Sequence, residues 1–166
     1  MCPSSPVSPP PRRVLVTGAS RGLGLEFVRQ LLARGDAVVA ACRRPRDAEA
    51  LAALASEHPD RLQLRALELT DPGSRAALLA SVEALWGGID LLINNAGVLA
   101  SGERFGQLDA ATFRAAFETN TLAPLLFAEA ATPLLAKGRT ATVAYLSSVL
   151  GSIASTQSFY TPSYAV

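Results

Sequence analysis

The sequence of 166 residues is poor in cysteine, in net charge and in long apolar runs, and each of these absences excludes a class of protein. It has two cysteines, Cys2 and Cys42, which argues against a disulfide framework or a zinc site and favours a reducing compartment. The formal net charge is +1, so the chain lacks the basic surplus of a nucleic-acid-binding domain. No apolar run reaches the roughly eighteen residues that span a membrane, and residues 1–6 lack the apolar centre of a secretory signal. These features predict a cytoplasmic protein with neither nucleic acid nor a membrane among its partners.

The composition that remains is typical of one globular domain. Apolar residues make up 49% of the chain and charged residues 17%. Residues 1–12 hold five prolines, which remove hydrogen-bond donors and favour extended backbone. We therefore expect a disordered proline-rich tail over 1–12 and a folded domain over 13–166.

The stretch from Val14 to Gly24 is the most informative part of the chain. Three apolar residues run into a turn with glycines at positions 18, 22 and 24, and a helical pattern follows at once. A buried strand that ends in such a turn and leads into a helix gathers backbone N–H groups at the positive end of that helix, which suits a phosphate. Tight strand–helix turns also need glycine for structural reasons alone, and the spacing differs from the common G-x-G-x-x-G fingerprint.

Strand and helix patterns alternate along the rest of the chain. Further strands are predicted over 37–42, 62–69, 89–93 and 140–146, and helices over 22–35, 47–57, 71–86 and 109–137. Asp71 should cap its helix, and Pro124 should bend the last one. The apolar helix positions expected in the core include Leu23, Phe27, Leu78, Leu79, Val82 and Leu85. This alternation predicts an α/β fold with a doubly wound parallel sheet of about five strands in three layers.

Three motifs in this order resemble the short-chain dehydrogenase/reductase family. They are Thr17–Gly24, Asn94-Asn95-Ala96-Gly97 and Ser148-Val149-Leu150-Gly151, and segments 24–30 and 118–124 resemble its C-factor-like, carbonyl-reductase-like branch. The resemblance covers residues 13–166. It implies a Rossmann-like NAD(P)-binding domain and an oxidoreductase that reduces a carbonyl group, or oxidises an alcohol, on a small-molecule substrate. A methyltransferase or a nucleoside-triphosphate enzyme is disfavoured, because no P-loop G-K-[ST] follows the glycines.

The resemblance also implies a set of cofactor-binding residues. They are Gly18, Ser20, Arg21, Gly22, Leu23 and Gly24 at the pyrophosphate, Arg43 at the ribose, Glu68 and Leu69 near the adenine, and Asn95, Ala96 and Gly97 on the adenosine side. Arginine after the second strand accommodates the 2′-phosphate of NADP, whereas an acidic residue there favours NAD. We therefore predict NADP over NAD. The alternative is that Arg43 is a solvated charge at a strand end. Asn94 is expected to secure neighbouring strands.

The family's catalytic residues are Asn, Ser, Tyr and Lys, of which this sequence matches Asn120, Ser148 and Tyr164. Ser147 is the rival serine, but Ser148 has the S-x-x-G spacing to Gly151. Tyr160 is the rival tyrosine, but the residue four positions after it is Tyr164 and not lysine, and the sequence ends at Val166, before the position four residues after Tyr164. We interpret the chain as a truncated product whose full-length parent forms a homo-oligomer. Three readings stay open: a reductase, a dinucleotide-binding module without turnover, and a fragment without function.

Overall fold

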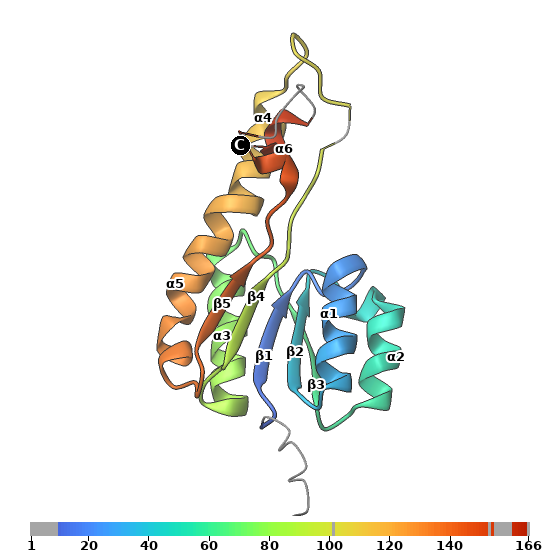
Figure 1. Cartoon of the computed structure of the whole chain (residues 1–166), viewed down its shortest axis with the longest axis vertical. Helices are drawn as coiled ribbons and strands as arrows, with labels where there is room; N and C mark the ends of the chain where they lie inside the picture. Colours follow the sequence, from blue (N-terminus) through green and yellow to red (C-terminus); the bar gives the residue numbers. More distant parts are fainter. Residues whose placement is uncertain (1–9, 101, 153, 155–160, 166) are drawn as a thin grey trace, which may run out of the picture.

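The computed structural model describes residues 10–100, 102–152, 154 and 161–165. Its centre is one parallel sheet of five strands in the order β3-β2-β1-β4-β5 (Figure 1). The strands are β1 (Arg13–Thr17), β2 (Ala37–Cys42), β3 (Leu62–Ala66), β4 (Leu91–Asn94) and β5 (Thr142–Tyr145). This arrangement confirms the predicted doubly wound α/β fold.

The helices cover both faces of the sheet. They are α1 (Gly22–Ala33), α2 (Glu49–Glu57), α3 (Pro72–Trp86), α4 (Ala110–Phe117), α5 (Ala123–Ala136) and α6 (Pro162–Ala165). One core lies between the sheet and α1 with α2, and the other lies between the sheet and α3 with α5. Val14 and Val16 face the first core and Leu15 faces the second, so β1 is apolar throughout because both of its faces are buried. The helix α4 and the short α6 stand together beyond the carboxyl ends of the strands (Figure 1).

Several predicted helix features are confirmed. Asp71 caps α3, accepting hydrogen bonds from the backbone N–H groups of Gly73 at 3.2 Å and Ser74 at 2.9 Å. Asp109 caps α4 in the same way. Two expected core positions are wrong. Leu23 is 66% exposed, because it lies in the first turn of α1 beyond the edge of the sheet, and Leu85 is 41% exposed, because Trp86 packs against the core in its place.

Three strand boundaries also differ from the prediction. β3 ends at Ala66 and not at residue 69, because the N–H of Glu68 turns away to the hydroxyl of Ser74. β4 begins at Leu91, because the N–H of Ile89 bonds to Leu134 at the end of α5. β5 covers only 142–145 of the predicted 140–146.

The long helix expected over 109–137 contains a widened π turn. This turn, η2 (Glu118–Leu122), lies between α4 and α5 and ends two residues before Pro124, the proline that was predicted to bend the helix. Such turns insert one extra residue into a helix and are frequent at functional sites. The chain therefore accommodates Pro124, which is buried at the start of α5, by local widening.

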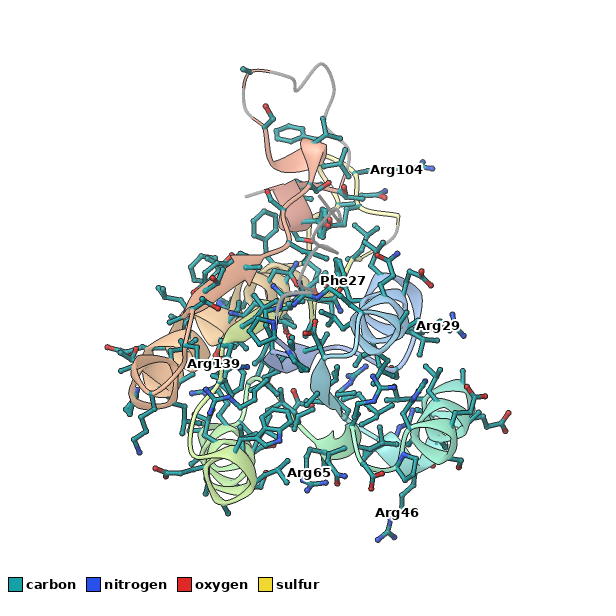
Figure 2. The ribbon with its side chains drawn as sticks, turned by 60° about the horizontal axis from the view of Figure 1, so that its bottom comes forward. Phe27, Arg29, Arg46, Arg65, Arg104 and Arg139 are labelled. Atoms are coloured by element: carbon teal, nitrogen blue, oxygen red, sulfur yellow. The ribbon has the colours of Figure 1, made fainter. Side chains whose placement is uncertain are left out.

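Two buried aspartates organise the edge of the sheet where the strands begin. Asp36 pairs with Arg34 at 2.8 Å and Arg12 at 3.3 Å, and Asp90 pairs with Arg13 at 2.9 Å and with Arg139 at 3.3 Å. Figure 2, in which this lower end comes forward, labels Arg139.

The expected disordered tail over 1–12 falls mostly outside the described residues, which begin at residue 10. Arg12, its last residue, is held at the sheet edge by Asp36, which accepts a 2.8 Å hydrogen bond from the Arg12 backbone N–H. In the part of the chain that the structure describes, no helix has the length and apolar character needed to cross a membrane.

Candidate functional site

The glycine turn between β1 and α1 is closely packed. Gly18 has a φ of +65°, and a Cβ there would lie 2.7 Å from the Cα of Ala96. A Cβ on Gly24 would collide with the backbone carbonyl of Gly18. Gly22 differs, because its φ is +56° but a Cβ would meet nothing within 4 Å. Gly18 and Gly24 are therefore required by packing, whereas Gly22 borders open space in front of α1.

Thr17 and Asn95 fix this turn to the end of β4. The Thr17 hydroxyl accepts hydrogen bonds from the backbone N–H groups of Asn95 and Ala96, both at 3.1 Å. The Asn95 amide donates to the backbone carbonyls of Thr17 at 2.8 Å and Gly18 at 3.0 Å. The role of Thr17 was missed in the sequence, although a buried threonine at the end of an apolar strand is a signal that it has a partner.

Asn94 does not secure a neighbouring strand, contrary to the prediction. Its amide donates to the backbone carbonyl of Pro124, in α5, at 3.4 Å. The alternation along β4 explains this, because Asn94 is two residues from Leu92 and points to the same face, which α5 covers. The side chain that connects two strands is that of Asn95.

A first cavity of about 350 Å³, here called the glycine cavity, opens in front of the turn. Eleven of the twelve predicted cofactor-binding residues line it: Gly18, Ser20, Arg21, Gly22, Leu23, Arg43, Glu68, Leu69, Asn95, Ala96 and Gly97. Gly24, the twelfth, lies behind the wall and packs against Gly18. Cys42 also lines the cavity, and burial raises the pKa of its thiol.

The glycine cavity has the features of an anion site. α1 begins next to it with no side-chain cap and no acidic residue in its first turn, so its first N–H groups are free to bind a negative charge. Arg21 and Arg43 are exposed at its walls, whereas the neighbouring Arg44 pairs with Asp47 at 3.5 Å. The Glu68 carboxylate accepts a hydrogen bond from the Thr70 hydroxyl at 3.0 Å.

A second cavity of about 480 Å³, here called the serine cavity, adjoins the first. Asn120, Ser148 and Tyr164 all line it, so the structure brings together the three predicted catalytic residues from η2, the turn after β5, and α6. The rival Ser147 lines it as well. The rival Tyr160 lies outside the described residues.

Asn120 joins the π turn to the segment after β4. Its side-chain oxygen accepts a hydrogen bond from the N–H of Val98 at 2.8 Å, and its amide donates to the carbonyl of Val98 at 2.9 Å. The side-chain oxygen and the side-chain amide of Asn120 thus both bind the backbone of the same residue, Val98. The arrangement fixes the wall shared by the two cavities.

Ser148 begins a single helical turn, η3 (Val149–Gly151), and its oxygen accepts a hydrogen bond from the N–H of Leu150 at 3.2 Å. A hydroxyl that accepts in this way keeps its own hydrogen for donation. Tyr164 is half-buried in α6. The one lysine of the sequence, Lys137, follows the far end of α5 and pairs with Glu83 at 2.8 Å, so it takes no part in this site.

Comparison with known proteins places this geometry in a family. A family model described as short chain dehydrogenase matches residues 12–165. An uncharacterized oxidoreductase of Schizosaccharomyces pombe is 32% identical over 139 residues, which cover 83% of this chain and 54% of that protein. An uncharacterized oxidoreductase of Mycobacterium tuberculosis is 33% identical over 142 residues, covering 84% and 56%. The chain thus spans about half the length of these relatives.

Among solved structures, the NADPH-bound carbonyl reductase from chicken fatty liver superposes with a TM-score of 0.86 at 38% identity. The match covers 93% of this chain and 68% of the chicken enzyme.

Proposed function

Since this chain belongs to the short-chain dehydrogenase family, we propose that its site serves the NADP(H)-dependent reduction of a carbonyl group, or oxidation of an alcohol, on a small substrate. One observation carries the proposal: the two cavities share a wall. Leu23, Asn95, Ala96, Gly97 and Val98 line both. A dinucleotide can therefore lie across this wall, with its phosphates in the glycine cavity and its reactive ring in the serine cavity.

The residues of the glycine cavity fit a dinucleotide. The uncapped start of α1 and the open space at Gly22 suit a pyrophosphate, since free backbone N–H groups face it there. Arg43 is the residue that we assign to the 2′-phosphate of NADP, because its guanidinium is exposed at the cavity wall. The NADPH carried by the chicken relative supports the same preference.

The serine cavity supplies the proton chemistry. The cofactor, when bound, supplies or accepts the hydride. Ser148 donates its hydroxyl hydrogen to the substrate oxygen, because toward Leu150 the hydroxyl acts as the acceptor and its hydrogen stays available. Tyr164 donates a proton to that oxygen during reduction and accepts it back during oxidation. We assign Asn120 to holding the Val98 backbone, and through it the shared wall.

A second candidate function is dinucleotide binding without turnover. It is favoured by the place of Lys137, which is the one lysine of the sequence and lies at the end of α5 away from Tyr164. Lys137 is therefore not placed to assist proton transfer by Tyr164, so this chain can bind the cofactor without catalysing the reaction.

A thermal-shift titration of this chain with NADPH and NADH, combined with a turnover assay, tests both functions. We expect a saturable rise in melting temperature with NADPH at lower concentration than with NADH. Gly22→Val should abolish this rise, because its side chain would fill the open space in front of α1 and a β-branched residue is strained at the φ of +56° in this turn. Binding with turnover of a carbonyl probe supports the reductase, and binding without turnover supports the second function. A melting temperature indifferent to both cofactors would contradict both.

A further inference from the structure

Glu103, in the segment between β4 and α4, contacts a residue sixty positions later in the sequence, Ser163. Its carboxylate oxygen Oε2 accepts hydrogen bonds from the backbone N–H of Ser163 at 3.2 Å and from the Ser163 hydroxyl at 2.8 Å. Ser163 is 2% exposed and directly precedes Tyr164. The other oxygen, Oε1, is buried and receives no hydrogen bond from the described residues. This half-buried carboxylate therefore interacts with α6 through one oxygen.

The start of α6 explains why such a contact is needed. Helices are commonly capped by the side chain of the residue before them, and here that residue is Thr161. Thr161 has a φ of +45°, a conformation unfavourable for a β-branched residue, and its buried hydroxyl has no partner among the described residues. Pro162 has no N–H, so Ser163 carries the first free donor of the helix. Glu103 takes that donor in place of the local cap.

We propose that Glu103 is a positioning residue for Tyr164. By capping α6 from another part of the chain, its carboxylate holds the helix against α4 and keeps the Tyr164 ring at the wall of the serine cavity. The importance of that position rests on the proposed function, in which Tyr164 moves the proton. The cap itself does not depend on the proposed function, so the two can fail separately.

The experiment compares the whole chain with three variants by amide hydrogen exchange. Glu103→Ala should make the Ser163 amide exchange about tenfold faster, the loss expected for one helix cap, while the amides of β1 and β2 stay protected. Glu103→Gln should restore protection, because both bonds go to one oxygen and an amide carbonyl can accept both. Arg104→Ala is the matched control, since this neighbouring side chain points away from the molecule (Figure 2).

A second readout follows the tyrosine ring. In protein labelled with ¹³C at the tyrosine ζ carbon, with Tyr164→Phe to assign the signal, we expect a distinct Tyr164 resonance in the wild type. It should move toward the position of a solvent-exposed tyrosine in Glu103→Ala and return in Glu103→Gln. A merely destabilised fold would also speed the exchange of the β1 and β2 amides, whereas loss of positioning shifts Tyr164 and leaves those amides protected. The NADPH titration, run on the same samples, reports separately on the proposed function.

The proposal is overturned if Glu103→Ala leaves the Ser163 amide and the Tyr164 resonance as they are in Arg104→Ala. It is also overturned if Glu103→Gln fails to restore them. Should Glu103→Ala not fold, Ser163→Ala decides instead, because it removes the hydroxyl bond and keeps the N–H bond. That variant should then show a partial shift of the Tyr164 resonance, and an unchanged resonance counts against the proposal.

Discussion

The buried hydroxyl of Thr17 serves three backbone groups, donating to Ile93 and accepting from Asn95 and Ala96. Thr17→Val keeps the shape of the side chain but leaves the partly buried N–H groups of Asn95 and Ala96 without an acceptor. We expect the free energy of unfolding to fall by about 1–3 kcal/mol, measured by urea denaturation. Thr132→Val is the control, since that hydroxyl lies on the exposed side of α5 and its loss should cost less than about 0.5 kcal/mol. Equal losses in the two variants would contradict the role of Thr17.

Arg43 and Arg44 are neighbours with different surroundings, which allows a matched test of cofactor preference. Arg43 lines the glycine cavity, whereas Arg44 pairs with Asp47. Arg43→Asp should weaken NADPH binding by about tenfold or more relative to NADH, because a charge-assisted hydrogen bond is lost and a like charge replaces it. Arg44→Ala should leave the ratio of the two dissociation constants unchanged. The measurement is isothermal titration with both cofactors, and an unchanged ratio in Arg43→Asp would show that another residue selects the phosphate.

For single residues, the sequence predicts the positions of glycines and charged side chains at the site better than it predicts which buried polar groups pair with each other. Gly18 could be placed beside the cavity because a glycine-rich strand–helix turn is recognisable in the sequence. Arg43 could be placed there because it follows the end of a predicted strand. The Glu103–Ser163 contact has none, since it joins residues sixty positions apart through a fold that only the structure shows. For the same reason the strand-connecting role was expected of Asn94, whereas the structure gives it to Asn95, which also lines the glycine cavity as predicted.

The start of α1 shows how one element depends on the absence of a side chain. Alanine normally stabilises a helix relative to glycine by about 0.5–1 kcal/mol. Gly24→Ala should do the opposite, because its Cβ would overlap the carbonyl of Gly18 and push the turn away from the sheet. We expect a loss of about 1–3 kcal/mol in thermal or urea unfolding, together with weaker NADPH binding.

A second glycine in a helix provides the control for that change. A Cβ on Gly73, in the first turn of α3, would meet the Asp71 carboxylate at 3.6 Å, an ordinary contact. Gly73→Ala should therefore raise the free energy of unfolding by about 0.4–1 kcal/mol. If Gly24→Ala were also stabilising, the close approach between α1 and the glycine turn would not exist in solution.

Element positions follow from local patterns where the pattern is unbroken. The strand predicted over 37–42 is β2 to the residue, since an apolar run bounded by charge leaves little choice. Ends that depend on a partner elsewhere were wrong, as at Glu68, where Ser74 takes the N–H that would have extended β3. The π turn at Glu118–Leu122 has only an indirect local signal, since Pro124 predicted a bend in the helix but not a widened turn before it.

In the whole molecule, the two cavities and the buried ion pairs lie at opposite edges of the sheet. Both cavities lie at the carboxyl ends of the strands, and the paired aspartates lie at the opposite edge. Asp90 joins three strands there, since Arg13 begins β1 and Arg139 precedes β5, and both also donate a backbone N–H to it at 2.8 Å and 2.7 Å. Changes at this edge should alter stability and leave cofactor preference as it is.

Acid should weaken the fold through this cluster, and Asp90→Asn measures by how much. The hydrogen bond from the Arg13 side chain is the main cause that holds the pKa of Asp90 well below the ordinary aspartate value of about 3.9. A carboxyl whose pKa is lower in the folded state stabilises the fold above its unfolded pKa, and that contribution is lost as the pH falls through the folded value. At pH 7, Asp90→Asn should therefore lower the free energy of unfolding by about 3 kcal/mol, because it leaves two arginines without their buried partner. The difference from the wild type in urea denaturation should shrink steadily below about pH 4, where the wild-type carboxyl loses its advantage.

Asp60→Asn, at an exposed position, is the control and should stay within about 0.5 kcal/mol of the wild type at every pH. A difference between Asp90→Asn and the wild type that is independent of pH would mean that Asp90 acts through its shape and hydrogen bonds and not through its charge.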